Sequence, residues 1–182
     1  MIGTQPKRRF SAVNLALISI FSALWIVFNF TVAPVGFQLT KLPLIHAVIS
    51  FLTLLLATWA TKQYGAASAV GMIGSTIVLL AGGPLPVLGF AAASLVFDAI
   101  LLVNRHSLNM KPFNIAIACL ATIVSSYFAG ILNGILILNQ APLFAVTVWG
   151  GWTIVGGIIG FAIAYPIIGA LERANVKKVK SS

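Results

Sequence analysis

The sequence predicts an all-α integral membrane protein, a single domain in which six transmembrane helices form a compact bundle with both termini in the cytoplasm. Three observations predict this fold: the apolar composition, the long uncharged runs, and the positions of the cationic residues. Hydrophobic residues make up 60% of the 182 residues and charged residues 7%, whereas about 25% of residues in a soluble domain are charged. A soluble domain of this size cannot bury so much apolar surface, so lipid must surround the chain.

The first two helices follow from two uncharged runs near the N-terminus. A helix that crosses about 30 Å of hydrocarbon needs about 20 apolar residues. The first run predicts a helix at about 13–33 that ends at Pro34, and the second predicts a helix at about 43–61, between Lys41 and Lys62. The first run is longer than the apolar core of a signal peptide, so we expect this helix to be retained.

The uncharged stretch 63–97 must contain a turn. As one helix it would be roughly 50 Å long, at about 1.5 Å per residue, which exceeds the thickness of the bilayer. Residues 82–86 read Gly-Gly-Pro-Leu-Pro, and glycine and proline end helices, while proline also suits the first turn of the next one. This break predicts helices at about 66–81 and 85–103.

The same reasoning divides the uncharged stretch 113–171. Residues 139–142 read Asn-Gln-Ala-Pro and supply the turn. They predict helices at about 113–138 and 143–171, which bring the number of spans to six. A basic tail at 172–182 then follows in the cytoplasm.

The positions of lysine and arginine test the number of spans. Cytoplasmic segments of membrane proteins carry an excess of these residues. With six spans and the N-terminus inside, all eleven Lys and Arg residues except Lys41 fall in inner segments, whereas five or seven spans would place the cationic ends on opposite sides. The net charge of +9 does not indicate nucleic-acid binding, because the cations lie between apolar runs and at the termini rather than on one face.

The acidic and histidine residues are too few and too scattered to predict an enzyme. Asp98 lies within the fourth expected helix, where an acid is either functional or paired with a cation such as Arg105. The histidines, His46 and His106, are not expected to share a site with Asp98, and no metal-ligand spacing such as H-E-x-x-H occurs. We therefore predict no catalytic residue, no metal site and no cofactor.

Polar and aromatic residues gather in the part of the chain that the predicted topology places near the outer surface. Polar groups beside indole rings are typical of a mostly apolar small-molecule pocket, although an aromatic belt and wet loop ends would give a similar pattern. Asn133 is the most informative, because it interrupts an apolar helix beside glycines. The substrate-binding candidates are Asn133, Trp149, Trp152, His46, Lys41, Asn139 and Gln140.

Small residues four apart mark stripes where helices can pack closely in lipid. Such pairs occur at Gly130 and Gly134 and at Gly156 and Gly160, where we expect packing inside the bundle. The first helix carries a stripe that begins with Ala12 and Ala16 at its cytoplasmic end. That stripe is the one placed where a partner protein could dock.

Several passages resemble the substrate-binding S components of energy-coupling factor (ECF) transporters, which take up vitamins and related micronutrients in prokaryotes. A basic start precedes residues 11–18 (Ser-Ala-Val-Asn-Leu-Ala-Leu-Ile), which look like the first helix of that family with its A-x-x-x-A coupling motif. The passages 69–74, 82–84 and 95–98 are similar to its middle region, and 156–160 with the basic tail are similar to its ending.

The resemblance implies a substrate-binding subunit in the plasma membrane of a prokaryotic cell. Such a subunit binds its vitamin-like substrate from outside in a pocket formed by the later helices and outer loops, and a transmembrane T subunit with two ATPase subunits supplies the energy. Ala12 and Ala16 would then contact the T subunit. The chain contains no G-x-x-x-x-G-K-[ST] motif, which agrees with an ATPase on separate subunits. The alternative is a structural or assembly subunit of a larger membrane complex.

Overall fold

The computed structural model describes residues 11–174, which are almost entirely helical and contain no strand. Short helical segments extend three of the long helices without a break, so the described chain forms six helical rods. The long helices are α1 (Ala12–Thr40), α2 (Leu44–Thr61), α3 (Ala66–Leu80), α4 (Val87–Leu101), α5 (Pro112–Leu132) and α7 (Gly151–Arg173). The short segments are η1 (Leu102–Asn104) after α4, η2 (Asn133–Ile137) after α5, and α6 (Pro142–Phe144) with η3 (Ala145–Gly150) before α7.

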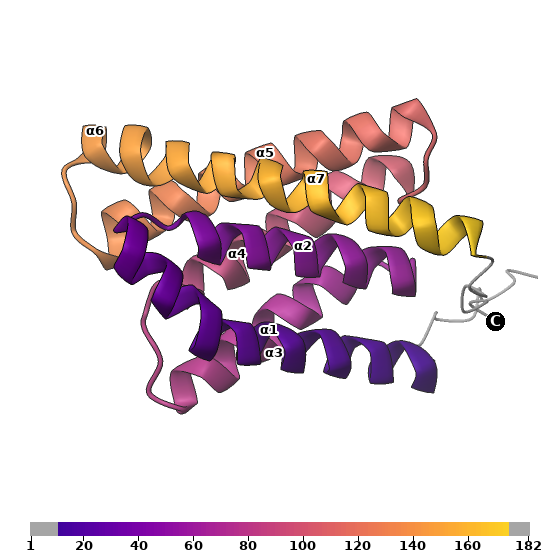
Figure 1. Ribbon diagram of the computed structural model, residues 1–182, viewed down its shortest axis with the longest axis horizontal. Helices are drawn as coiled ribbons and strands as arrows, with labels where there is room; N and C mark the ends of the chain where they lie inside the picture. Colours follow the sequence, from indigo (N-terminus) through magenta and orange to yellow (C-terminus); the bar gives the residue numbers. More distant parts are fainter. Residues whose placement is uncertain (1–10, 175–182) are drawn as a thin grey trace, which may run out of the picture.

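The six rods pack side by side along the long axis of the molecule (Figure 1). Around the bundle the neighbours are α1, α3, α4, α5, α7 and α2, and α2 packs back against α1 to close the ring. Helix α2 also contacts α3 and α5, so it is the most central helix. The start of α1 and the end of α7 lie at the same end of the bundle (Figure 1), as an even number of crossings requires.

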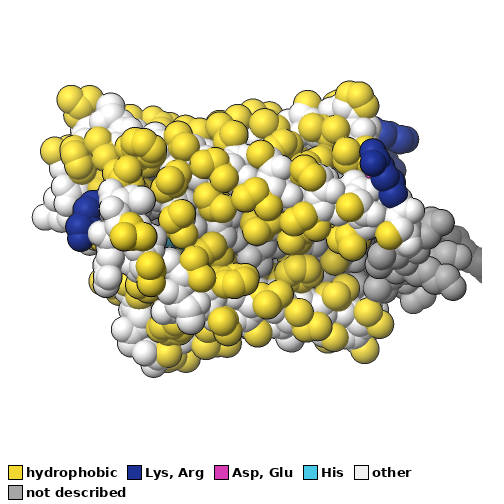
Figure 2. Space-filling model, in the orientation of Figure 1, with side chains coloured by type: hydrophobic (Ala, Val, Ile, Leu, Met, Phe, Trp, Pro, Cys, Tyr) yellow, Lys and Arg dark blue, Asp and Glu magenta, His cyan; other side chains and the backbone are white. Residues whose placement is uncertain are grey.

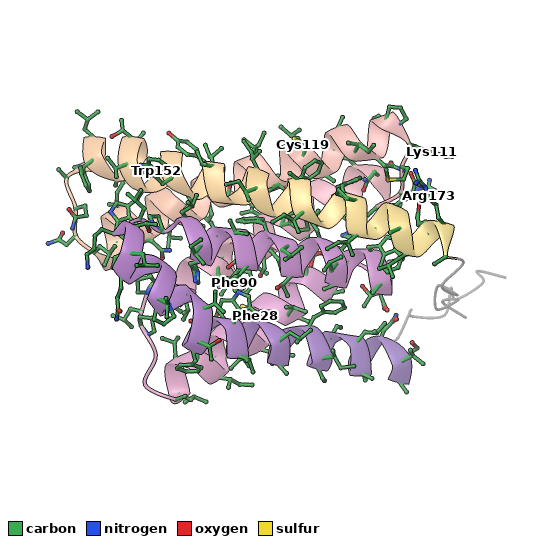
Figure 3. All side chains as sticks on the ribbon, in the orientation of Figure 1. Phe28, Phe90, Lys111, Cys119, Trp152 and Arg173 are labelled. Carbon is green, nitrogen blue, oxygen red and sulfur yellow. The ribbon has the colours of Figure 1, made fainter. Side chains whose placement is uncertain are left out.

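The surface of the bundle is that of a multi-pass membrane protein. Five helical segments are long and apolar enough to cross a membrane, and α3, with 15 residues, is a shorter apolar helix. Figure 2 shows hydrophobic side chains over the middle of the molecule and Lys and Arg side chains at its two ends. Lys111 and Arg173 lie together at the end where α1 begins (Figure 3), and Lys41 ends α1 at the other. Following the predicted orientation, we call these the inner and the outer end.

Helix α1 differs from the sequence prediction because it does not end before Pro34. It continues to Thr40, with Pro34 inside it, and it bends along its course (Figure 1). A proline removes one backbone hydrogen bond and kinks a helix. Packing of the residues before and after the proline can still keep the helix continuous. Here Ala33 and Gly36 are buried, and Gly36 lies so close to Ile45 of α2 that an added Cβ would be 2.5 Å from its side chain. The other five rods, with their short segments included, begin and end within a few residues of the expected bounds.

The glycine pairs of the fifth and sixth rods serve packing within the bundle, as predicted. A Cβ at Gly156 would lie 2.5 Å from the backbone oxygen of Leu44, and one at Gly160 would lie 2.7 Å from that of Val48. These glycines let α7 lie backbone to backbone against α2. Gly130 makes an equally close approach to Gly150.

A buried polar cluster closes the inner end, and it corrects the expectation that neither histidine shares a site with Asp98. Asp98 and His106 are 1% and 3% exposed, with His106 Nε2 3.2 Å from Asp98 Oδ1. The other carboxylate oxygen accepts a 2.7 Å hydrogen bond from the backbone N–H of Ser68, in the first turn of α3. The backbone of Arg105 and His106 adopts positive φ angles of 53° and 56°. This sharp turn after η1 folds the His106 ring back onto α4, a conformation that sequence spacing did not indicate.

Candidate functional site

A cavity of about 440 Å³ lies in the outer half of the bundle, between all the rods except α3. Its walls come from the second half of α1, the first half of α2, the start of α4, the end of α5 with η2, and the η3–α7 junction. The lining residues are Asn29, Ala33, Pro34, Phe37, Gln38, Pro43, His46, Ala47, Ser50, Phe51, Pro84, Pro86, Val87, Phe90, Ala93, Ala129, Asn133, Leu138, Trp149 and Thr153. Its volume lies in the usual range for small-molecule sites, about 300–1,000 Å³.

The cavity is mostly apolar and has aromatic walls. The aromatic rings come from four rods and include Phe37, Phe51, Phe90 and Trp149. Phe90 stacks on Trp25 behind it, with ring centroids 4.2 Å apart, and the side chain of Phe90 is labelled in the interior of the bundle in Figure 3. No Lys, Arg, Asp or Glu belongs to the described lining. The site is therefore neutral.

On one wall, Asn29 of α1 and His46 of α2 form a polar pair. Asn29 Nδ2 lies 3.0 Å from His46 Nδ1. Because the amide nitrogen can only donate, His46 Nδ1 is the acceptor and the ring proton belongs on Nε2. Trp25 holds this wall in place: its ring meets His46 edge to face at 5.9 Å, and its Nε1 donates to Ser50 Oγ at 3.1 Å.

On the opposite wall, Asn133 presents a buried amide at the start of η2. The residue is 5% exposed, and its Oδ1 is buried without a hydrogen-bond partner in the described chain. The amide rests on Gly89 of α4, where an added Cβ would lie 2.4 Å from Oδ1. A buried polar atom without a partner is costly, so it calls for an explanation such as a bound water or ligand. Five other such atoms in residues 11–174, on Asn14, Ser22, Thr58, Asp98 and Asn104, belong to residues that do not line the cavity.

Two widened helical turns lie next to each other beside the cavity. In η2 the backbone N–H of Leu138 donates to the oxygen of Asn133 at 2.9 Å, five residues back. The η3 segment is widened in the same way, and Gly134 packs against Ala145 between them. Such wide turns often occur at functional sites. Sequence reasoning missed them, since no residue type signals them.

The structure brings three of the seven candidate binding residues to the cavity. These are Asn133, Trp149 and His46. Lys41, Asn139 and Gln140 are exposed at the ends of helices or in the loop before α6, and none of them lines the cavity. Residues that sequence reasoning did not select include Phe51 and Phe90, which look like ordinary core aromatics until the bundle is assembled.

Trp152 also lies outside the cavity, although the sequence placed it on one helical face with Trp149. It is 39% exposed and lies at the edge of the bundle in Figure 3. The widened turn of η3 explains the difference. A wide turn rotates less per residue than an α-helix, so two residues three apart at the η3–α7 junction diverge around the axis instead of sharing a face.

At the inner end, both Ala12 and Ala16 are exposed on the outward face of α1. The inward face of the same turns is buried through Asn14 and Ile18. Asn14 also donates to Gln63 in the loop after α2, which ties the start of α1 to the bundle. The alanines are thus free of internal packing and lie on a firmly held helix.

Within residues 11–174, no group of three or more His, Cys, Asp or Glu side chains could hold a metal ion. Comparison of the chain with protein-family models, with curated proteins and with solved structures gives no match. The function must therefore be argued from the cavity and the surface.

Proposed function

We propose that this protein is the substrate-binding membrane subunit of an ECF-type importer, which captures a vitamin or related micronutrient from outside the cell. The observation that supports it best is the neutral cavity of about 440 Å³ whose wall includes Asn133, with a buried amide oxygen that has no partner in the described chain. A subunit that served only as structure would gain stability from filling such a cavity and from replacing the amide by an apolar side chain.

The position of the cavity supports capture from outside. The cavity lies in the half of the bundle that ends at Lys41, while Lys111 and Arg173 lie at the opposite end (Figure 3). Because cations favour the cytoplasmic side, the cavity belongs to the outer half. We place the protein in the plasma membrane of a prokaryotic cell, in agreement with the resemblance of its first helix to that family.

The inner end supplies a surface for the rest of the transporter. Helix α1 is the least buried of the five long spans, and Ala12 and Ala16 leave its cytoplasmic turns smooth, so that another helix can approach its backbone closely. In this proposal a transmembrane T subunit docks there, and two ATPase subunits act through it. The substrate-binding subunit itself supplies recognition.

The test separates coupling from binding. Ala12→Leu and Ala16→Leu add bulk to an exposed stripe, so the isolated variants should fold and bind ligand as the parent does, while copurification with a T subunit and ATPases and uptake into cells should be lost. Ala162→Leu is the matched control, because Ala162 is an exposed alanine on α7, and it should leave all of these properties unchanged.

Two results would contradict the proposal. If Ala16→Leu assembled with the T subunit and ATPases and transported normally, the docking surface would be elsewhere. If the parent protein copurified with a large complex lacking ATPases, and no small molecule could be extracted from it, the structural or assembly subunit would be the better interpretation.

A further inference from the structure

The cavity excludes charged ligands by its composition. Every described side chain in its wall is neutral, and the described carboxylates, Asp98 and Glu172, are not among them. A charge that enters an apolar site without a counter-charge loses its hydration and gains no ion pair. The ligand therefore enters in an uncharged form.

The hydrogen-bonding groups define the ligand further. Because His46 Nδ1 accepts from Asn29, the ring proton of His46, a residue of the cavity wall, is on Nε2, where it can donate. On the other wall, Asn133 lines the cavity, and its buried Oδ1 has no partner within residues 11–174. A rotation of this primary amide about its last side-chain bond would present an N–H donor and an oxygen acceptor side by side to a ligand. Such an amide pairs in two hydrogen bonds with any edge that carries an acceptor next to a donor, as asparagine does with adenine.

The walls between these groups suit a ring. Aromatic side chains from α1, α2, α4 and η3 surround the cavity, and aromatic rings contact one another best through offset stacking or edge-to-face packing. A flat ligand can contact them while its edges reach His46 and Asn133. A flexible polar chain would leave most of its polar groups unpaired here.

We infer that the cavity binds an uncharged nitrogen heterocycle whose edge carries an N–H next to a carbonyl oxygen or ring nitrogen. That edge pairs with the amide of Asn133, and a second acceptor on the ring system receives the Nε2–H of His46. The inference rests on the proposed function, since it names the substrate class of the importer. It assigns Asn133 as the residue that selects the edge and His46 as the residue that orients the ring.

The probe for this inference is quinazolin-4(3H)-one, a neutral bicyclic lactam with a second ring nitrogen as acceptor. Binding to the purified full chain in nanodiscs is measured by ligand-observed NMR and thermal shift at pH 7. Quinoline-4-carboxylate and 1-methylquinolinium serve as anionic and cationic bicyclic comparisons, and each should bind at least about 100-fold more weakly. The 3-methyl derivative of quinazolin-4(3H)-one keeps both acceptors but loses the N–H, and it should bind about tenfold more weakly.

One variant tests whether Asn133 makes the contact with the ligand N–H. Asn133→Leu should weaken quinazolin-4(3H)-one about tenfold and bring its affinity level with that of the 3-methyl derivative, because the partner of the N–H is gone. Asn139→Leu changes an exposed position outside the cavity. It should leave the ratio between the affinities for quinazolin-4(3H)-one and its 3-methyl derivative unchanged. The comparison of the two probes on the parent protein stands even if Asn133→Leu fails to fold.

The inference is overturned if the carboxylate or the cation binds as tightly as the lactam, if methylation of the lactam nitrogen has no effect, or if the lactam does not bind. None of these results bears on assembly. A protein that copurifies with a T subunit and ATPases but fails the probe test keeps the importer function and loses this ligand class. A protein that binds the lactam but assembles with no ATPase retains the ligand class and loses the importer.

Discussion

The two ends of the bundle differ in how many hydrogen bonds their buried polar side chains make. At the inner end most such side chains make at least one hydrogen bond, although Asn14, Asp98 and Asn104 each keep one buried oxygen without a hydrogen-bond partner in the described chain. Asp98 accepts from the start of α3, and Asn114 Nδ2 donates to Asn109 Oδ1 at 2.8 Å. The Tyr165 hydroxyl donates to the backbone oxygen of Asn114 at 3.3 Å. At the outer end Asn133 is as deeply buried, but its side chain makes no hydrogen bond within the described chain, and it lines the cavity.

The difference separates polar groups that specify the fold from those available to a ligand. A buried polar group with a partner contributes about 1 kcal/mol, and one without a partner costs about 1–3 kcal/mol. Substitution at the inner end should therefore lower stability. Substitution at the outer end should lower affinity and leave stability unchanged or raised.

The largest effect should come from Asp98→Ala. It removes the acceptor of the Ser68 N–H in the first turn of α3 and the neighbour of His106, which leaves two buried donors with fewer partners. We expect a loss of about 3 kcal/mol in the free energy of unfolding, measured by denaturant titration in mixed micelles. Asp98→Asn, which keeps an oxygen for Ser68, should lose less than half as much. If Asp98→Ala were as stable as the parent, the cluster would not hold the inner end together.

The next effect separates two tryptophans that are three residues apart. Trp149→Ala removes an aromatic wall of the cavity and should weaken ligand binding by about tenfold to a hundredfold, measured with the ligand extracted from the parent protein. Trp152→Ala changes an indole outside the cavity, and it should change affinity less than about twofold. Equal losses in the two variants would mean that the widened turn of η3 does not direct the two side chains apart.

These tryptophans also show how far the sequence could predict the molecule. The rods were predictable, because charge and hydropathy fix where a chain can cross lipid. The cavity was predictable only in part. Asn133 was identifiable because an amide inside an apolar helix is costly unless it is bonded. Trp149 was identifiable because indole rings are common in binding sites. The true neighbours of both residues depend on the wide turns η2 and η3, which no residue type signals.

The inner cluster was missed for a related reason. The spacing of Asp98 and His106 on a regular helix would not place the two side chains together. The contact depends on positive φ angles at Arg105 and His106, which turn the chain back after η1. Non-glycine residues adopt such angles rarely, so sequence reasoning did not anticipate the turn. The predicted helix end at Pro34 was wrong for a different reason. Proline often ends a helix, but here α1 packs against α2 and continues through Pro34.

The smallest effect should come from Gly89→Ala, which tests whether the Asn133 amide must keep its position. The new Cβ would lie 2.4 Å from Asn133 Oδ1, so the amide must turn away. Affinity should fall by about fivefold to tenfold, while the stability changes by less than about 1 kcal/mol, because alanine favours the helix by an amount that offsets the crowding.

Gly151→Ala is the matched control for that substitution. Gly151 also lies in a helix at the level of the cavity, but an added Cβ there would meet nothing within 4 Å. Gly151→Ala should gain the same stability from the higher helix propensity of alanine, and ligand affinity should not change. A drop in affinity for both variants would show that any stiffening near the cavity impairs binding. A drop for Gly89→Ala alone would tie binding to the position of one amide, which is what distinguishes the outer end from the inner one.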